Sequence, residues 1–365
     1  MHSYKKRKSN NKSVKLTPFA QTLTSWYRGH KRNLPWRLTK DPYPIWLSEI
    51  ILQQTRVEQG LPYWERFMAS FPNIADLANA SETRVLLLWQ GLGYYSRARN
   101  LHTTAKIVHN EYQDKFPTTY AELLKLKGIG PYTAAAIASI CFDEQTPVVD
   151  GNVYRFASRY FGIETDIATS GARKIFTEIL ATHIPAESPG NFNQALMEHG
   201  SMVCAPSPVC EKCDFISSCY AYSKKLQKSL PIKSKKLKVR KRYFNYLVIS
   251  HDEKMYLKVR KANDVWHGLY DFYLIEGKHT EEEVLTMASA ALKSTHFLIS
   301  EISGEVLHVL SHQRIIARFY TLSVSKALSS SVMQNLRIDK FSTEEILNLP
   351  KPKLIVNYLE ARGIK

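Results

Sequence analysis

Four of the five cysteines lie within sixteen residues of one another, in the spacing C-x5-C-x2-C-x5-C. They are Cys204, Cys210, Cys213 and Cys219. Four thiolates this close can surround one metal centre, either a tetrahedral zinc ion or an iron–sulfur cluster. Zinc sites usually carry two C-x2-C pairs that lie farther apart, whereas a compact loop with one short inner gap suits a bulkier cubane. We therefore predict a [4Fe–4S] cluster, with zinc and unliganded thiols as the alternatives.

Glu49 lies in the strongly apolar segment IWLSEIILQQT, which has the composition of a buried helix. A carboxylate in such surroundings is costly to ionise unless it is paired, and burial raises its pKa. A carboxyl group that stays protonated near neutral pH suits the role of a general acid. The alternative is a glutamate on the one exposed face of its helix.

Asp150 ends an apolar extended run, PVVDGNV, and stands just before a segment with helical periodicity. Aspartate at this kind of boundary is commonly a helix N-cap. By itself the position is best explained in that way. A catalytic carboxylate that works together with Glu49 is the alternative.

The segment LKGIGPYT, residues 126–133, has helical sequence on both sides. Gly128 and Gly130 therefore predict a tight helix–hairpin–helix turn. Glycine lets backbone N–H groups approach a phosphate closely, and the N-terminus of the following helix adds a favourable dipole. We predict that this turn contacts DNA, with an ordinary helix-breaking turn as the alternative.

The elements that would position these residues divide into two kinds. Helical signals dominate the first part of the chain, where Thr119 and Glu122 form a possible capping box and residues 133–140 are rich in alanine. After the lysine-rich segment, extended runs alternate with a helical pattern. The runs cover residues 243–250, 255–259 and 314–323, and the helical pattern covers residues 281–292. We predict a multi-domain protein, all-α in its first domain and α+β in its last.

The predicted domain boundaries lie where the sequence pattern changes from helical to lysine-rich and then to mixed. We expect a basic tail at residues 1–15, a helical domain at 16–225, a basic linker at 226–241 and a second domain at 242–365. The net charge of +17 falls almost entirely in the tail and in the stretch from Lys224 to Arg242. Basic runs of this kind favour a nucleic-acid partner over an anionic membrane surface. No apolar run is long enough to span a membrane, and the N-terminus has no secretory signal. We expect a cytoplasmic protein.

Several of these segments together resemble the MutY-type adenine DNA glycosylases. They are LPWR (34–37), WLSEIILQQT (46–55), GLGYYSRARNL (91–101), the hairpin, VVDGNV and the four-cysteine loop, in colinear order across residues 16–225. The last part of the chain resembles that family's Nudix-like domain more loosely, through VWHGLYDF (265–272) and HVLSHQRI (308–315). The family excises adenine that is mispaired with 8-oxoguanine.

The resemblance implies base excision repair by a monofunctional glycosylase, which hydrolyses the N-glycosidic bond of adenine opposite 8-oxoguanine or guanine and leaves an abasic site. The chemistry can be argued independently. Adenine leaves its sugar only if the base is protonated and the oxocarbenium ion left behind is stabilised. Glu49 fits the acid, and Asp150 fits the ionised carboxylate beneath the sugar. The expected partner is duplex DNA with such a mispair, bound by a monomer, at the nucleoid if the source is a prokaryote.

Further site residues rest on the resemblance alone. Asn152 and Tyr132 would support Asp150 and the developing charge. Trp36, Arg37 and Gln194 would line the adenine pocket. Gln54 and Tyr94 would occupy the gap that opens when the nucleotide is flipped out of the duplex, and Gly128 and Gly130 would contact the DNA backbone. A surface aromatic without such a role is the alternative for Tyr94.

The last domain is predicted to recognise the lesion. It lacks the glutamate-rich Nudix box, so we do not expect pyrophosphate hydrolysis. The family contacts 8-oxoguanine with a Phe-Ser-His loop, which here is Leu310, Ser311 and His312. Leu310 loses the flat stacking surface of the aromatic ring. An ordinary β-turn is the alternative for this loop.

Two other functions compete with this reading. Endonuclease III-type glycosylases share the helical fold, but they place a lysine just after the hairpin, where an amine can form a Schiff base and cleave the strand. Tyr132 takes that position here, and a phenol cannot form an imine. A non-catalytic lesion-binding protein would not need Glu49 and Asp150 together.

The first cysteine gap has five residues where the family usually has six, which requires a tighter path between Cys204 and Cys210.

Overall fold

The computed structural model describes residues 16–234, 239–262, 264–293 and 296–364, so the predicted basic tail and part of the predicted linker lie outside the described residues. The described chain forms two compact units. The first combines the described residues of Met1–Glu49 and Phe116–Lys235, and the second combines those of Ile50–Lys115 and Lys236–Lys365. No helix among the described residues has the length and apolar character needed to cross a bilayer.

The first unit is helical. Its elements are α1 (Pro18–His30), η1 (Pro35–Arg37), most of α2 (Pro42–Ile51), α7 (Tyr120–Leu123), α8 (Pro131–Phe142), α9 (Gly151–Phe161), α10 (Ala172–Ala181), α11 (Pro189–Met202), η2 (Cys210–Lys212), η3 (Ile216–Ser218) and α12 (Tyr220–Ser223). The helices begin where the sequence provides capping groups. Thr17 accepts a hydrogen bond from the amide of Ala20 (3.2 Å) at the start of α1. Proline occupies the first position of α8 and α11, where a missing N–H costs nothing.

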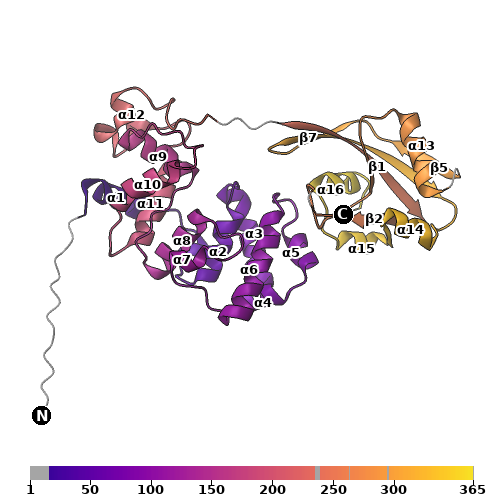
Figure 1. Ribbon diagram of the computed structural model, residues 1–365, viewed down its shortest axis with the longest axis horizontal. Coiled ribbons are helices and arrows are strands. Elements are labelled where there is room, and N and C mark those ends of the chain that lie inside the picture. The colour runs from indigo at the N-terminus through magenta and orange to yellow at the C-terminus, as the bar shows by residue number, and fades with distance from the viewer. Residues whose placement is uncertain (1–15, 235–238, 263, 294–295, 365) are drawn as a thin grey trace, which may run out of the picture. The chain divides into compact units, whose positions relative to one another are not determined.

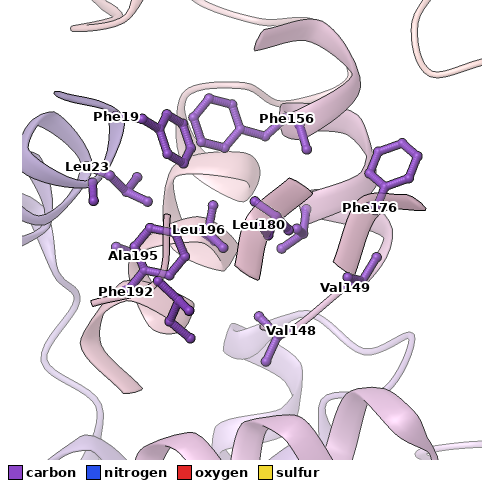
Figure 2. Packing of buried hydrophobic residues seen from close by; sticks show 14 of the residues in the cluster. Phe19, Leu23, Val148, Val149, Phe156, Phe176, Leu180, Phe192, Ala195 and Leu196 are labelled. Carbon is purple, nitrogen blue, oxygen red and sulfur yellow. The ribbon is translucent and has the colours of Figure 1, made fainter. Parts of the chain in front are cut away.

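The core of the first unit is built mainly from α1, α9, α10 and α11. Figure 2 shows aromatic and aliphatic side chains from these helices packed together, with two valines from the extended run before α9 at the edge of the cluster. Phe19, Phe156, Phe176 and Phe192 are almost completely buried. Phe19 lies 5.8 Å from Phe156, between ring centroids, in a tilted arrangement. The helices that carry Asp150 and Gln194 are therefore held against each other by large apolar contacts.

The second unit combines helices with a mixed sheet. Its helical part has α3 (Val57–Ser70), α4 (Ile74–Asn79), α5 (Glu82–Leu88) and α6 (Ser96–Tyr112). The later part has β1 (Arg240–His251), β2 (Lys254–Val259), β3 (Tyr270–Asp271), β4 (Tyr273–Glu276), α13 (Glu281–Leu292), β5 (Phe297–Ile302), β6 (Val306–Val309), β7 (Gln313–Val324), α14 (Ser330–Leu336), β8 (Asp339–Phe341), α15 (Thr343–Leu347) and α16 (Lys353–Glu360).

Among the described residues the sheet has eight strands, and it is built around a parallel pair. β1 pairs in parallel with β7, and Figure 1 shows these two long strands side by side. The main order is β3-β2-β1-β7-β5, and β4, β6 and β8 pair with β1, β7 and β2. All pairings other than β1 with β7 are antiparallel. α13 packs its apolar residues, among them Val284 and Ala288, into the same buried cluster as Leu247 and Tyr320 of the sheet.

The predicted fold class is confirmed, with helices in the first part of the chain and an α+β arrangement in the last. The three predicted extended runs lie within β1, β2 and β7, and the helical pattern at 281–292 matches α13. Thr119 caps α7, where its hydroxyl accepts from the amide of Glu122 (3.3 Å). The predicted domain boundaries stay a prediction.

Gly190 allows α8 and α11 to approach closely. A Cβ atom on Gly190 would lie 2.7 Å from the Cα of Ile140 and 2.8 Å from the carbonyl oxygen of Ser139. Both of these atoms belong to the backbone of α8, so they cannot rotate away as a side chain could. By contrast, a Cβ on Gly29 in α1 would meet nothing within 4 Å.

We predict that Gly190→Ala destabilises the protein by about 1–3 kcal/mol, since the two helices must move apart to admit the methyl group. The measurement is the midpoint of urea unfolding, followed by circular dichroism. Gly29→Ala is the matched control and should be neutral or stabilising by up to about 1 kcal/mol, because alanine favours helix without a clash. Equal midpoints for the two variants would contradict the close approach of α8 and α11.

Candidate active site

Glu49 lies near the end of α2, directly after six buried residues of that helix. Its Oε2 accepts a hydrogen bond from the phenol of Tyr132 (2.6 Å). Burial raises the pKa of Glu49 to about 7, and the negative charge of Asp150 adds to the rise. The hydrogen bond from Tyr132 and the charge of Arg37 oppose it. Glu49 is therefore a carboxyl group that holds a proton close to neutral pH.

Tyr132 is the second residue of α8, so the hairpin positions it directly. Its hydroxyl contacts the sulfur of Met197 (3.0 Å) in addition to Glu49. Burial, together with the charges of Glu49 and Asp150, raises the pKa of Tyr132 well above its usual value. The phenol therefore stays protonated and acts as a donor.

Asp150 is the N-cap of α9, and its carboxylate has two close donors. Oδ1 accepts from the amide of Val153 (2.8 Å), and Oδ2 accepts from the side-chain amide of Asn152 (2.9 Å). Burial raises the pKa of Asp150, while the bonds from Val153 and Asn152 and the charge of Arg155 lower it. The favoured N-cap explanation is thus correct, and it is compatible with the second role, because the cap fixes the carboxylate beside Glu49 and Tyr132.

The start of α9 is also tied to the cysteine loop. Arg155 donates from Nη2 to the side-chain oxygen of Asn152 (2.9 Å) and from Nε to the carbonyl of Cys204 (2.7 Å). α11 comes close at the same point, since a Cβ on Gly200 would lie 2.7 Å from the carbonyl oxygen of Asn152. Asp150 and the first cysteine are therefore joined by two side chains of one helix.

The three residues predicted for the adenine pocket lie in the same unit as Glu49. Trp36 is buried in η1, and Arg37 follows it. Gln194 on α11 accepts a hydrogen bond from the phenol of Tyr27 (3.1 Å). The guanidinium of Arg37 lies 5.8 Å from the centre of the Tyr27 ring. Tyr27 therefore connects the two polar residues, and the sequence analysis did not single it out.

Glu198 is a second residue that the sequence analysis missed. It is buried on α11, and Arg32 and Arg37 each donate to its Oε2 at 2.7 Å. Burial alone would raise its pKa, but the bonds from the two arginines lower the pKa of Glu198 to about 2. Glu198 is therefore an ionised partner that fixes Arg37. Its spacing of four residues from Gln194 puts both on one face of α11, and this spacing is the signal that could have revealed it.

The four predicted cysteines line one small cavity of about 30 Å³ in the first unit. Burial raises the pKa of Cys213 to about 11, and the charges of the other three add to the rise, so the thiols lie close together. Thiolates in this setting need a positive partner at neutral pH, which a metal centre supplies. In the part of the chain that the structure describes, no three histidine, cysteine, aspartate or glutamate side chains converge on one metal ion. A cubane does not require this, because each thiolate binds a different iron. The donor set fits such a cluster.

Three of the four predicted DNA-contacting residues have a positive φ angle. Gln54 and Tyr94 have φ angles of 56° and 48°, in the left-handed region that side chains other than glycine, asparagine and aspartate rarely adopt. Both side chains are exposed, and Tyr94 is 39% exposed while its neighbour Tyr95 is buried. Gly128 has a φ of 80°, and Gly130 is the N-cap of α8 with open space where a Cβ would stand. The hairpin thus leaves the start of α8 uncovered within its unit.

Leu310, Ser311 and His312 form the turn between β6 and β7, as the alternative for this loop proposed. The amide of Leu310 donates to the carbonyl of Gln313 (2.9 Å) and closes the turn. Ser311 and His312 are exposed, and Leu310 is half-buried. Within the second unit, the hydroxyl of Ser311 is hydrogen-bonded to the phenol of Tyr94. The structure therefore brings together the loop predicted to recognise the lesion and one residue predicted to fill the gap in the duplex.

Comparisons with known proteins agree with this arrangement. Residues 47–182 match the family described as HhH-GPD superfamily base excision DNA repair protein, and residues 245–361 match the NUDIX domain. The adenine DNA glycosylase of Buchnera aphidicola subsp. Schizaphis graminum is 34% identical over 336 residues, which cover 92% of this chain and 96% of that protein. The chain belongs to the adenine DNA glycosylase family.

Other relatives cover little more than half of the chain. The adenine DNA glycosylase of Rattus norvegicus is 43% identical over 220 residues, which cover 57% of this chain and 42% of that protein. A solved structure of a thermostable thymine-DNA glycosylase is 30% identical, with a TM-score of 0.53, and the match covers 56% of this chain and 95% of that one. The chain is accordingly a base excision repair enzyme whose helical glycosylase fold is followed by a Nudix-like domain.

The raised pKa of Glu49 predicts how activity depends on pH. If Glu49 delivers a proton, excision is full while Glu49 is protonated and falls as the pH rises through about 7. Tyr132→Phe removes a hydrogen bond that favours the carboxylate, so the pKa of Glu49 rises and the fall moves to higher pH. The measurement is the single-turnover excision rate against pH.

Tyr154→Phe provides the control for this experiment. Tyr154 lies on α9 and packs against Phe176, with ring centroids 4.7 Å apart. Its loss should leave the pH of the fall unchanged. A fall that stays in place, or moves to lower pH, in Tyr132→Phe would show that the hydrogen bond does not set the pKa of Glu49.

Proposed function

We propose that this chain is a monofunctional glycosylase that hydrolyses the N-glycosidic bond of adenine mispaired with 8-oxoguanine or guanine in duplex DNA. One observation carries the proposal. The phenol of Tyr132 donates a hydrogen bond to Glu49 at 2.6 Å, and the negative charge of Asp150 raises the pKa of both groups. An acid and a carboxylate thus lie together where endonuclease III-type enzymes place an amine. The named relatives are adenine DNA glycosylases, which supports adenine as the base that is removed.

The two carboxyl groups divide the work because their surroundings differ. Glu49, whose pKa is raised to about 7 by burial, is assigned the acid role and gives its proton to the five-membered ring of adenine, so the base leaves with the electrons of the bond to C1′. Asp150 is held by donors from Val153 and Asn152 at the start of a helix, which favours its ionised form. It stabilises the positive sugar, and a water molecule then adds to C1′ and leaves an abasic site.

The adenine pocket is assigned to Trp36, Arg37 and Gln194. Arg37 is fixed by the buried carboxylate of Glu198, and Gln194 is fixed by Tyr27. Side chains that are already held in place lose little freedom when the base enters, so the pocket selects its ligand at low entropic cost.

The left-handed backbones of Gln54 and Tyr94 support their assignment to the gap in the duplex. Each such conformation costs of order 1 kcal/mol or more, and strain of this kind is concentrated at functional sites. An exposed aromatic ring and an exposed amide are suited to insertion at a base step. The helix–hairpin–helix turn at Gly128 and Gly130 supplies N–H groups for phosphate.

The cysteine loop is assigned to a resident [4Fe–4S] cluster held by Cys204, Cys210, Cys213 and Cys219. When bound, the cluster would supply the positive charge that holds the four thiolates, of which Cys204 is buried and the other three are half-buried. Hydrolysis moves no electrons, so the cluster is assigned to shaping the loop, which Arg155 and Arg159 tie to α9. We propose a monomer that acts on DNA, in the cytoplasm at the nucleoid if the source is a prokaryote.

Asp150→Asn tests the reaction. Asparagine is also a good N-cap, so the helix should keep its start while the negative charge is lost. We predict normal binding of a duplex with adenine opposite 8-oxoguanine and excision slower by at least about 10²-fold. Asp143→Asn is the matched control, since Asp143 is an exposed C-cap paired with Lys40, and its excision rate should be normal.

Analysis of the products of this reaction, with and without alkali, distinguishes the competing functions. Wild-type product should show strand breaks only after alkali, and borohydride should trap no covalent complex, because Tyr132 cannot form an imine. Breaks without alkali, together with a trapped complex, would favour the endonuclease III-type lyase. Binding of the mispair with no breaks under either condition would favour a non-catalytic lesion-binding protein.

Recognition of 8-oxoguanine is tested at the β6–β7 turn. Ser311→Ala should reduce the preference for adenine opposite 8-oxoguanine over adenine opposite guanine by up to about tenfold, the value of one hydrogen bond. Leu310→Phe should increase that preference by adding a stacking surface. The measurement is the ratio of single-turnover rates on the two duplexes.

Two variants control this test. Ser300→Ala changes an exposed serine of β5 and should leave the ratio unchanged. Tyr94→Phe removes the hydrogen bond to Ser311 but keeps the Ser311 hydroxyl. If Tyr94→Phe changed the ratio as much as Ser311→Ala, the effect would belong to their mutual contact and the direct contact of Ser311 with the lesion would be excluded.

A further inference from the structure

His199 is a completely buried histidine on α11 that the proposed reaction does not use. Its ring is enclosed by aromatic side chains. The ring centroids of Phe156, Trp26 and Phe215 lie 4.3, 4.9 and 5.1 Å from that of His199. Burying a polar ring in such surroundings costs free energy unless one of its nitrogens has a partner.

The partner that the structure provides is a cysteine sulfur. Nε2 of His199 lies 3.6 Å from Sγ of Cys213, within the range of a hydrogen bond to sulfur. Nδ1 is buried and has no hydrogen-bond partner in the described part of the chain. The main chain places the ring at this point, because the carbonyl of His199 accepts from the amide of Cys204 (2.9 Å).

These contacts determine which nitrogen carries the proton. If the proton were on Nδ1, a buried N–H donor would lack an acceptor, and Nε2 would present a lone pair to a thiolate. With the proton on Nε2, the ring donates to the sulfur, and only a lone pair is left without a partner, which is the less costly arrangement. The Nε2–H form is therefore the one that the site favours.

We propose that His199 is a positioning residue of the cysteine site, whose Nε2–H donates to the Cys213 thiolate and raises the reduction potential of the bound cluster. The inference rests on the proposed [4Fe–4S] cluster. Hydrogen bonds to the sulfur ligands are among the factors that set the potential of such clusters. An N–H donor spreads the negative charge on sulfur, so it favours the reduced form.

The site gives its sulfurs different donors. Arg159 on α9 reaches Sγ of Cys204 from Nη1 (3.5 Å), and His199 on α11 reaches Cys213. These two helices also carry Asp150 and Gln194. Removal of His199 should therefore change the electronic state of the cluster through Cys213, while Cys204 keeps its charged donor.

The experiment compares His199→Leu and His199→Gln in the full-length holoprotein. Leucine fills part of the space without a donor, whereas the side-chain amide of glutamine can place an N–H near the position of Nε2. We expect iron and sulfide contents equal to wild type in both, a lower midpoint potential and faster oxidative loss of cluster absorbance in His199→Leu, and values close to wild type in His199→Gln.

His183→Leu controls for lost packing. His183 stacks on Phe161 with ring centroids 5.1 Å apart and donates or accepts at Thr17, so its loss perturbs the same core without removing a donor to sulfur. Its midpoint potential should match wild type. An unchanged potential in His199→Leu, or equal shifts in His199→Leu and His199→Gln, would overturn the inference.

A second measurement covers the case in which His199→Leu does not fold. Wild-type protein labelled with ¹⁵N-histidine should show a histidine nitrogen coupled to the oxidised cluster by pulsed electron paramagnetic resonance, and His199→Gln should lose it. No coupled nitrogen in wild type would overturn the role of His199. Wild-type protein without iron and sulfide would instead refute the proposed cluster on which the inference rests.

Discussion

Burial of one carboxyl group is the constraint on which the site depends. Glu49 has a pKa near 7 because α2 removes it from water and because Asp150 adds a negative charge nearby. The phenol of Tyr132 moderates this cost through a single short bond. Ionised carboxylates in apolar surroundings are expensive, so the fold must hold either a proton or a donor at this point, and the arrangement at α8 provides the donor.

The remaining structure of the first unit holds that group in place. α9 and α11 meet where Gly200 approaches Asn152, and their packing is secured by the aromatic core in Figure 2. Arg155 joins the start of α9 to the cysteine loop, and Glu198 on α11 fixes Arg32 and Arg37. A displacement of either helix would therefore reach Asp150, Arg37 and the cysteines together, because interiors this dense transmit strain.

In the second unit, the unfavourable feature is backbone conformation and not a buried carboxyl group. Gln54 and Tyr94 hold left-handed backbone conformations on exposed segments. The contact between Tyr94 and Ser311 connects one of these segments to the turn of the Nudix-like domain. Conformational strain and exposure of an aromatic ring are both unfavourable in isolation, and their coincidence is the physical reason to connect these positions with a ligand.

The sequence by itself determined the fold class, the elements at α13, β1, β2 and β7, and the types of residue that could do chemistry, because periodicity, caps and motif spacing are local properties of the chain. It also left Asp150 with two explanations, and the structure shows that the cap and the position beside Glu49 coexist. Only the tertiary structure decided that Tyr132 bonds to Glu49, that Glu198 joins Arg32 and Arg37, and that His199 meets Cys213. The two members of each pair lie far apart in the sequence or on different elements, and no local sequence pattern predicts their contact. A buried polar contact depends on which helix faces come together.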